Sequence, residues 1–397
     1  MLTSIDKNIE RLDARKLYAQ YYTCNDISSV LVERLEQLPT PSKIIDLSMG
    51  EGALLQSAKN IYPRATLYGC DIDSKNVNFV SKQENLNVNV FNIDSTSKAL
   101  DVLIGTNSFE LVLGNPPFGF IEKTPFIVNI LNEFGCNCSS ANVSLELLFV
   151  LLGIRCLKHD GVLSYILPDG LLTNARYENF REVLISNYRV ISVVHLGKKR
   201  FEGTEACTHI LTLKKRKLKS PYKVKLESID FPNSSISISK SEFISRADYS
   251  YHTKPSHLNA RKLKTLNAQL IRGRLPNKQL SNMSVDFIHT TSFGSSDFKV
   301  FSNENIENDN EKHVKDGDIV IARVGTRAIG KVGLVSKGCF HISDCIIAIR
   351  ADDEKSRELI LRTLKSRAGK NWLNSISKGV GARHITLTDL SELPIFI

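Results

Sequence analysis

The chain has 397 residues, of which 42% are apolar and 24% are charged, a composition typical of globular proteins. This excludes a disordered or collagen-like chain, and no apolar run approaches the roughly 18 residues that a membrane span needs. The formal net charge is +10, because 52 Lys and Arg face 42 Asp and Glu.

The first residues, Met1 to Arg15, alternate charged with isolated apolar residues. They lack the apolar stretch of a secretory signal, so we expect a cytoplasmic, DNA-associated protein of a bacterium or archaeon rather than a secreted one. The eight cysteines include no paired CxxC spacing, and we therefore expect no metal site.

From Lys43 to Leu213, short apolar runs alternate with amphipathic stretches, which predicts an α/β domain with a doubly wound, mostly parallel, seven-stranded sheet. The expected strands are Lys43–Leu47, Thr66–Cys70, Val88–Asn92, Leu111–Gly114, Gly161–Leu167, Val190–Leu196 and His209–Lys214. The expected helices are Ala53–Asn60, Lys75–Gln83, Leu145–Leu157 and Tyr177–Asn187.

Three successive strands end in an acidic residue: Asp46, Asp71 and Asp94. After Asp46 comes a turn with Gly50 and Gly52, which lets the backbone approach a ligand closely. Asp71 follows about 20 residues later, where nucleotide-binding sheets carry the acid that holds ribose hydroxyls. A plain βα turn is the alternative interpretation of the glycines alone.

The most specific motif is Asn115-Pro116-Pro117-Phe118, directly after an apolar strand. Two prolines cannot continue a sheet, so the chain must leave at the strand's carboxyl end, where open α/β sheets bind ligands. The Asn115 amide oxygen and the Pro116 carbonyl are two acceptors suited to an sp² amino group, with the Phe118 ring able to stack on its heterocycle. A strand-terminating turn is the structural alternative.

Together these motifs resemble the S-adenosylmethionine-dependent N6-adenine DNA methyltransferases of restriction-modification systems, in the circular order called the gamma class. In that class an N-terminal segment precedes the glycine motif, and Ala19-Gln20-Tyr21-Tyr22-Thr23 followed by the amphipathic Ile27–Leu38 matches it. Later motifs are matched by Glu146, Phe149, Gly161 to Pro168 and Phe201-Glu202-Gly203-Thr204.

The resemblance implies roles for individual residues. Thr23, Asp46, Gly50, Gly52, Asp71, Ile72 and Asp94 would bind S-adenosyl-L-methionine, Asn115, Pro116, Pro117 and Phe118 would be catalytic, and Phe201 would lie against the flipped adenine. The adenine would have to leave the duplex, which costs a few kcal/mol of unstacking. The chain departs from the family at Leu47, where a proline is usual, and at Ser95, where an aromatic residue is common.

The amino-acid composition changes after Leu213: a basic run, Lys214 to Lys217, is followed by the serine-rich stretch Phe231 to Ser245. We therefore divide the chain into a catalytic methyltransferase domain, 1–215, a linker or covering arm, 216–250, and a DNA target-recognition domain, 251–397. Residues 201–397 contain 32 basic and 21 acidic residues, whereas residues 1–200 contain 20 and 21, so the second half is suited to a polyanion.

The last domain is expected to be mixed α+β, with short strands, glycine turns and one helix, Lys355–Ser375. Gly317 to Thr326 and Gly379 to Ile385 resemble parts of the target-recognition domains of type I specificity subunits. Its candidate DNA-binding residues are Arg272, Arg274, Lys278, Arg323, Arg327, Lys331 and Arg383.

The leading hypothesis is thus a site-specific adenine-N6 methyltransferase acting on double-stranded DNA, the modification enzyme of a restriction-modification or related defence system. The resemblance leaves room for a separate restriction endonuclease or partner subunit. Two alternatives are a methyltransferase of the same fold acting on RNA or protein, and a non-catalytic DNA-binding subunit with a relic fold.

Overall fold

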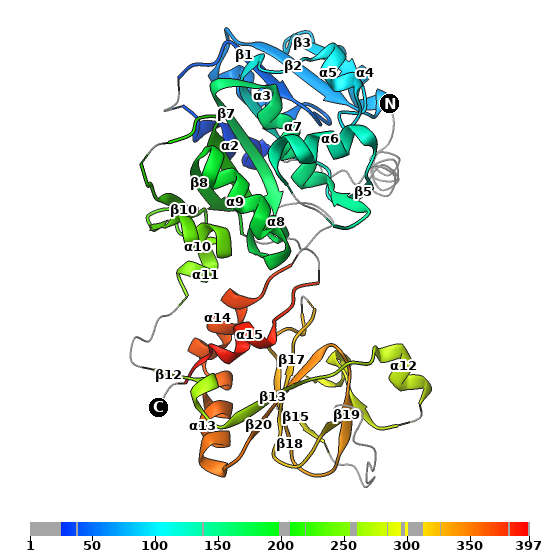
Figure 1. Ribbon diagram of the computed structural model, residues 1–397, viewed down its shortest axis with the longest axis vertical. Coiled ribbons are helices and arrows are strands. Elements are labelled where there is room, and N and C mark those ends of the chain that lie inside the picture. The colour runs from blue at the N-terminus through cyan, green and yellow to red at the C-terminus, as the bar shows by residue number, and fades with distance from the viewer. Residues whose placement is uncertain are drawn as a thin grey trace. The chain divides into compact units, whose positions relative to one another are not determined.

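The computed structural model describes residues 25–36, 39–136, 139–197, 207–218, 220–254, 260–283, 285–294, 298–300, 313–325, 327–379 and 382–395. The chain divides into two compact units, Met1–Tyr249 and Ser250–Ile397 (Figure 1). Each unit buries apolar clusters of its own. No helix in the described ranges is long and apolar enough to cross a membrane.

Unit 1 is built on a sheet that has nine strands among the described residues, in the order β11-β10-β8-β9-β7-β4-β1-β2-β3. The strands are β1 (Lys43–Asp46), β2 (Thr66–Asp71), β3 (Val88–Asn92), β4 (Phe109–Gly114), β7 (Leu157–Pro168), β8 (Arg189–His195), β9 (Thr208–Lys214), β10 (Val224–Ser228) and β11 (Ser235–Ile238). Neighbours from β7 to β3 pair in parallel, whereas β9 runs antiparallel between β7 and β8. A short hairpin, β5 (Phe120–Glu122) with β6 (Asn142–Ser144), lies outside this sheet.

Helices cover both faces of the sheet. The helical elements of unit 1 are α2 (Asn25–Glu33), α3 (Ala53–Ile61), α4 (Ser74–Ser81), α5 (Ala99–Leu103), α6 (Pro125–Phe134), α7 (Leu145–Cys156), α8 (Asp169–Thr173), the 3-10 turn η1 (Ala175–Tyr177), α9 (Glu178–Asn187) and α10 (Lys240–Ser245). The short helix α11 (Tyr249–His252) spans the boundary between the two units. Successive strand residues belong to opposite cores, since Ile44 packs with α2 and α3 while Ile45 packs with α6, α7 and α9. This two-faced burial is the doubly wound architecture that the sequence predicts.

The sheet exceeds the expected seven strands because residues 224–238 add β10 and β11 to its edge. Strand β10 pairs in parallel with β8, and β11 pairs antiparallel with β10. The stretch 216–250 is expected as a linker or covering arm, but all of it except Ser250 belongs to unit 1, where it forms β10, β11 and α10. Its buried residues, such as Val224, Leu226 and Ile238, alternate with serine and charged residues, and the serine content hid that pattern.

Unit 2 is a mixed α+β fold, as expected. Its strands are β12 (Arg261–Lys262), β13 (Ala268–Arg272), β14 (Phe287–Ile288), β15 (Phe298–Val300), β16 (His313–Val314), β17 (Ile319–Ala322), β18 (Val332–Val335), β19 (Phe340–Ile342), β20 (Ile346–Ala351) and β21 (Pro394–Ile395), and its helices are α12 (Asn277–Asn282), α13 (Glu354–Lys365), α14 (Arg367–Ile376) and α15 (Leu387–Ser391). The largest sheet, β13-β20-β17-β18-β15, packs one face on α13, α14 and α15.

The single helix expected over Lys355–Ser375 is in fact two helices, α13 and α14. Ser366 between them has an extended backbone, and its hydroxyl accepts the Gly369 N–H at 2.9 Å as the cap of α14. A Cβ on Gly369 would lie 2.0 Å from the Thr363 carbonyl oxygen, so only glycine allows this tight corner. The periodicity of apolar residues does not reveal this break, because the helices on both sides of it are amphipathic.

Candidate active site

The carboxyl ends of four parallel strands meet at one edge of the unit 1 sheet. Asp46 at the end of β1 is in register with Gly69 of β2 on one side and with Leu113 of β4 on the other. Asp71 ends β2 opposite Asn92. The Asn-Pro-Pro-Phe turn starts directly after β4, so the predicted cofactor and catalytic segments are neighbours.

The glycine turn after β1 needs its glycines. Gly50 and Gly52 have φ of 55° and 85°, in the left-handed region that other residues rarely adopt, and Gly52 begins α3. The Gly50 N–H donates to Asp71 Oδ2 at 2.8 Å. The turn is thereby fixed to the acid of the neighbouring strand.

Asp46 is a buried carboxyl group, with 1% of its surface exposed. Its Oδ1 accepts the Ser48 N–H at 2.9 Å, and lies 3.2 Å from where a Cβ on Gly114 would stand. Burial raises the pKa of Asp46 to about 7, the neighbouring Asp71 adds to the rise, and the Ser48 N–H opposes it. A cationic ligand would favour the ionised form of this group.

Asp71 is held in place by the backbone on both sides. Besides the Gly50 N–H, it accepts the Asp73 N–H at 2.8 Å, and burial raises its pKa. Ile72, which follows it, is 49% exposed at the same edge. The side-chain amide of Asn92 donates to the carbonyls of Asp71 and Ile72 at 3.0 and 3.1 Å, a support that strand and turn patterns in the sequence did not reveal.

Asp94 and its neighbour Ser95 continue the edge beyond β3. Asp94 is exposed, and its Oδ1 accepts both the N–H and the hydroxyl of Thr96, at 2.8 and 2.7 Å. The Ser95 hydroxyl is buried and donates to the Leu47 carbonyl at 2.7 Å. The two departures from the family pattern, Leu47 and Ser95, are thus bonded to each other and stabilise the same edge.

The Asn-Pro-Pro-Phe turn leaves the sheet where its prolines predict. Asn115 is half-buried, and its carbonyl accepts a long hydrogen bond of 3.4 Å from the Ser48 hydroxyl. Pro116 and Phe118 are buried, and Pro117 is partly buried. The glycine turn and the Asn-Pro-Pro-Phe turn are therefore in direct contact.

Glu146, near the start of α7, anchors the far end of that turn. Its carboxylate accepts the Ser144 hydroxyl at 2.5 Å and the Gly119 N–H, while the Gly119 carbonyl accepts the Leu145 N–H at 2.9 Å. Both backbone groups of Gly119, which has φ of 145°, are thus engaged. Glu146 is 8% exposed, and burial raises its pKa. The sequence marked Glu146 as part of a later motif without assigning it this role.

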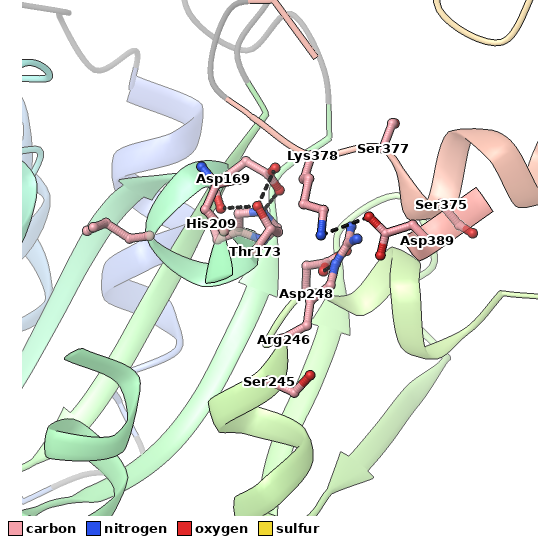
Figure 2. A network of polar contacts seen from close by, with 12 residues as sticks. Asp169, Thr173, His209, Ser245, Arg246, Asp248, Ser375, Ser377, Lys378 and Asp389 are labelled. Carbon is pink, nitrogen blue, oxygen red and sulfur yellow. Dashed lines mark hydrogen bonds and ion pairs between the residues drawn. The ribbon is translucent and has the colours of Figure 1, made fainter. Parts of the chain in front are cut away.

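A buried polar group lies where β7 ends, as Figure 2 shows. Asp169 bonds His209 Nε2 at 3.0 Å and the Thr173 hydroxyl at 3.1 Å. The ring of His195 lies 5.1 Å from that of His209, and burial, with a smaller effect of His209, lowers the pKa of His195 to about 4. His195 is therefore neutral at pH 7. Sequence patterns gave no sign of this group, because its residues come from three strand ends.

Two predicted site residues lie outside the described residues. They are Thr23, expected near the cofactor, and Phe201, expected at the target base. Their roles remain predictions from the family resemblance.

The predicted DNA-binding residues of unit 2 fall into two groups. Five are exposed: Arg272, Arg274, Lys278, Arg327 and Lys331. Arg323 is 8% exposed and donates to the carbonyls of Ile385 and Asp344, and Arg383 donates to those of Asn374 and Ser377. We therefore infer that Arg323 and Arg383 hold the backbone of unit 2 in place. In the same unit, Lys378 pairs with Asp389 at 2.9 Å (Figure 2).

Comparison with known families finds a match for each of the two parts of the chain. The model of the N-6 DNA methylase family matches residues 11–252, more than half of the chain. The chain belongs to the N-6 DNA methylase family. Residues 255–397 match the type I restriction modification DNA specificity domain. Both resemblances predicted from the sequence are thereby confirmed.

Two relatives of this N-6 DNA methylase are viral enzymes. The chain is 24% identical over 204 residues to the type II methyltransferase M.CvrRI of Paramecium bursaria Chlorella virus XZ-6E, covering 49% of this chain and 48% of the relative. It is 24% identical over 171 residues to modification methylase CviBIII of Paramecium bursaria Chlorella virus NC1A, covering 42% of each. The chain thus spans about half the length of these curated relatives.

A solved structure with a similar fold is the type IIG restriction endonuclease BpuSI. The TM-score is 0.54 at 14% sequence identity, and the match covers 96% of this chain and 59% of that one. This likeness supports the fold class that the sequence predicts, an α/β unit with a second unit.

Proposed function

We propose that this N-6 DNA methylase transfers a methyl group from S-adenosyl-L-methionine to the N6 amino group of a flipped adenine in double-stranded DNA. The main support is that two turns are in contact at one edge of the sheet. One is the glycine turn, which lies beside Asp46 and Asp71. The other is the Asn-Pro-Pro-Phe turn. One turn is suited to a cationic nucleoside and the other to an amino group on a flat ring. Few other reactions need both.

The residues at this edge fit the cofactor by their chemistry. The buried Asp46 carboxylate would pair with the ammonium group, Asp71 and Ile72 would hold the ribose and adenine, and Asp94 would bond the adenine amino group. Gly50 and Gly52 keep the backbone free of side chains there. When bound, the sulfonium group supplies an activated methyl carbon.

The catalytic turn would orient the target amino group. The Asn115 amide oxygen and the Pro116 carbonyl accept its two hydrogens, which turns the nitrogen lone pair out of conjugation with the ring. Phe118 stacks on the base. Methyl transfer from the sulfonium would leave the positive charge on the amino nitrogen. That cationic nitrogen is strongly acidic, so its proton leaves without a strong base beside it, in line with a motif that contains no His or Lys.

Unit 2 would read the target sequence, with its exposed basic residues on phosphates and base edges. A separate restriction endonuclease or partner subunit completes the proposed system. RNA or protein as the substrate, and a relic without activity, are the alternative outcomes.

The test is transfer of a radiolabelled methyl group from S-adenosylmethionine to unmethylated plasmid DNA, followed by sequencing that detects modified adenines. Asn115→Ala should abolish transfer, whereas Asn85→Ala, at an exposed position before β3 and so at the opposite sheet edge, should not. Methyladenine at one short motif supports the proposal. Cofactor binding with transfer only to RNA or protein, or no cofactor binding at all, contradicts it.

A further inference from the structure

An exposed aromatic ring follows the catalytic turn. Phe120, two residues after Phe118, begins β5 and is 57% exposed. The chain also leaves β7 at this edge, runs through α8, and reaches η1 at Ala175–Tyr177. These two segments, about 55 residues apart in sequence, meet at the side chain of Arg176.

Arg176 is stacked on two rings. Its Cζ lies 5.1 Å from the centroid of Phe120 and 4.7 Å from that of Tyr177. Such cation–π contacts restrict the orientation of a guanidinium group, and a contact with a ring face does not use up its N–H donors. The side chain is therefore preorganised, although Arg176 itself is exposed.

Within the described ranges, Arg176 has no carboxylate at ion-pair distance. The acid that its charge influences is Glu146, whose carboxylate already accepts the Ser144 hydroxyl and the Gly119 N–H. A fixed, exposed cation beside an exposed ring is a pattern found where proteins bind the backbone of nucleic acids. The planar guanidinium group of arginine can donate two parallel N–H bonds to the oxygens of a phosphate group.

We propose that Arg176, supported by Phe120 and Tyr177, binds a backbone phosphate of the target strand next to the extruded nucleotide. The inference rests on the proposed function, since it takes DNA as the substrate. Extruding a base rotates its backbone, and a phosphate contact beside the catalytic turn holds the rotated strand. Arg176 is thus a binding residue of unit 1, separate from the sequence-reading residues of unit 2.

The decisive experiment measures binding of the full chain to a short DNA duplex by fluorescence anisotropy over a range of salt concentrations. Arg176→Gln should weaken binding about tenfold at low salt. It should also make the slope of log K against log salt less steep by about 0.9, the value for one lost phosphate contact. The methylated motif should stay the same, because a phosphate contact carries no sequence information.

Arg64→Gln is the matched control. Arg64 is also exposed, but it precedes β2 and therefore lies at the amino-terminal edge of the sheet. We expect wild-type affinity and slope for it. Arg176→Lys and Phe120→Leu should keep the slope, since the charge remains, but weaken binding a few-fold because the guanidinium fork or its support is lost.

The outcomes separate this inference from the proposed function. If Arg176→Gln and Arg64→Gln show the same affinity and slope, the Arg176 contact is refuted even when the wild type methylates DNA. If the wild type binds the duplex with the expected dependence on Arg176 but transfers no methyl group, the contact stands and the proposed activity fails. A wild type that does not bind DNA overturns both. Thermal unfolding and cofactor affinity should be unchanged in Arg176→Gln, which excludes misfolding as the cause.

Discussion

Asp46 gives the clearest dependence on pH at the scale of single residues. Burial raises the pKa of its carboxyl group to about 7, so the proposed pairing with the cofactor's ammonium group strengthens as pH rises through that value. We expect the dissociation constant for S-adenosylmethionine to fall between pH 6 and pH 8. Asp46→Asn should weaken binding and remove this pH dependence, as measured by calorimetric titration. A pH-independent wild type would contradict the assignment.

The same carboxyl group has an effect of opposite sign on stability. Its folded-state pKa lies above the ordinary value of 3.8, so its contribution to stability is fully present below pH 3.8 and is lost as pH rises through about 7. A shift of this size corresponds to about 4 kcal/mol. Asp46→Asn should therefore raise the melting temperature of the cofactor-free protein at pH 8 more than at pH 5. An equal change at both pH values would show that the burial cost is not electrostatic.

Residue-scale reasoning from the sequence placed Asp46 and Asp71 at strand ends and Gly50 and Gly52 in a turn, where the structure has them. Strand ends and left-handed turns leave clear patterns in a sequence. The same reasoning did not predict their supports. The bond from Ser95 to Leu47, the Asn92 amide and the Asp169–His209 pair each join segments far apart in sequence, and no local pattern encodes such contacts.

At the scale of elements, the start of α7 holds the end of the Asn-Pro-Pro-Phe turn, which we propose to be catalytic, through the bond from Gly119 to Glu146. A hydrogen bond to a charged group contributes about 1.5–3 kcal/mol to stability. Weakening the bond from the Gly119 N–H to the Glu146 carboxylate should therefore displace Gly119 and the turn before it. Glu146→Gln should lower kcat about tenfold or more while the cofactor dissociation constant stays unchanged. Single-turnover methyl transfer with saturating DNA measures this split.

Glu110→Gln is the matched control for Glu146→Gln. Glu110 also carries several hydrogen bonds, from Ser42, Lys43 and Lys158, but at the opposite end of β4. It should leave kcat unchanged. Equal losses in the two variants would mean that Glu146 acts on general stability and not on the turn.

The elements themselves were predictable where their periodicity was strong. All seven expected strands of the first domain exist, and the helices after Gly52 and Ser144 begin within a residue of the expected positions. Strands β10 and β11 were missed because half of their positions are serine or charged. Their buried positions become apparent only once β8 offers an edge to pair with.

At the scale of the whole molecule, the two units should be separable by function. The double change Arg327→Gln and Lys331→Gln removes two exposed cations of unit 2. We expect weaker DNA binding, and a slope of log K against log salt that is less steep by the amount expected for about two lost phosphate contacts. Cofactor affinity should not change, because the proposed cofactor residues all belong to unit 1. Isothermal titration with cofactor and anisotropy with DNA measure the two effects. An altered cofactor affinity would contradict this division.

The central claim is that the Asn-Pro-Pro-Phe turn presents an adenine amino group to the cofactor edge. The most direct measurement is mass spectrometry of nucleosides from plasmid DNA methylated by the purified chain and by Asn115→Ala. We expect N6-methyladenine from the wild type and none from the variant. Methylation of another base, or N6-methyladenine made equally well by Asn115→Ala, would contradict it.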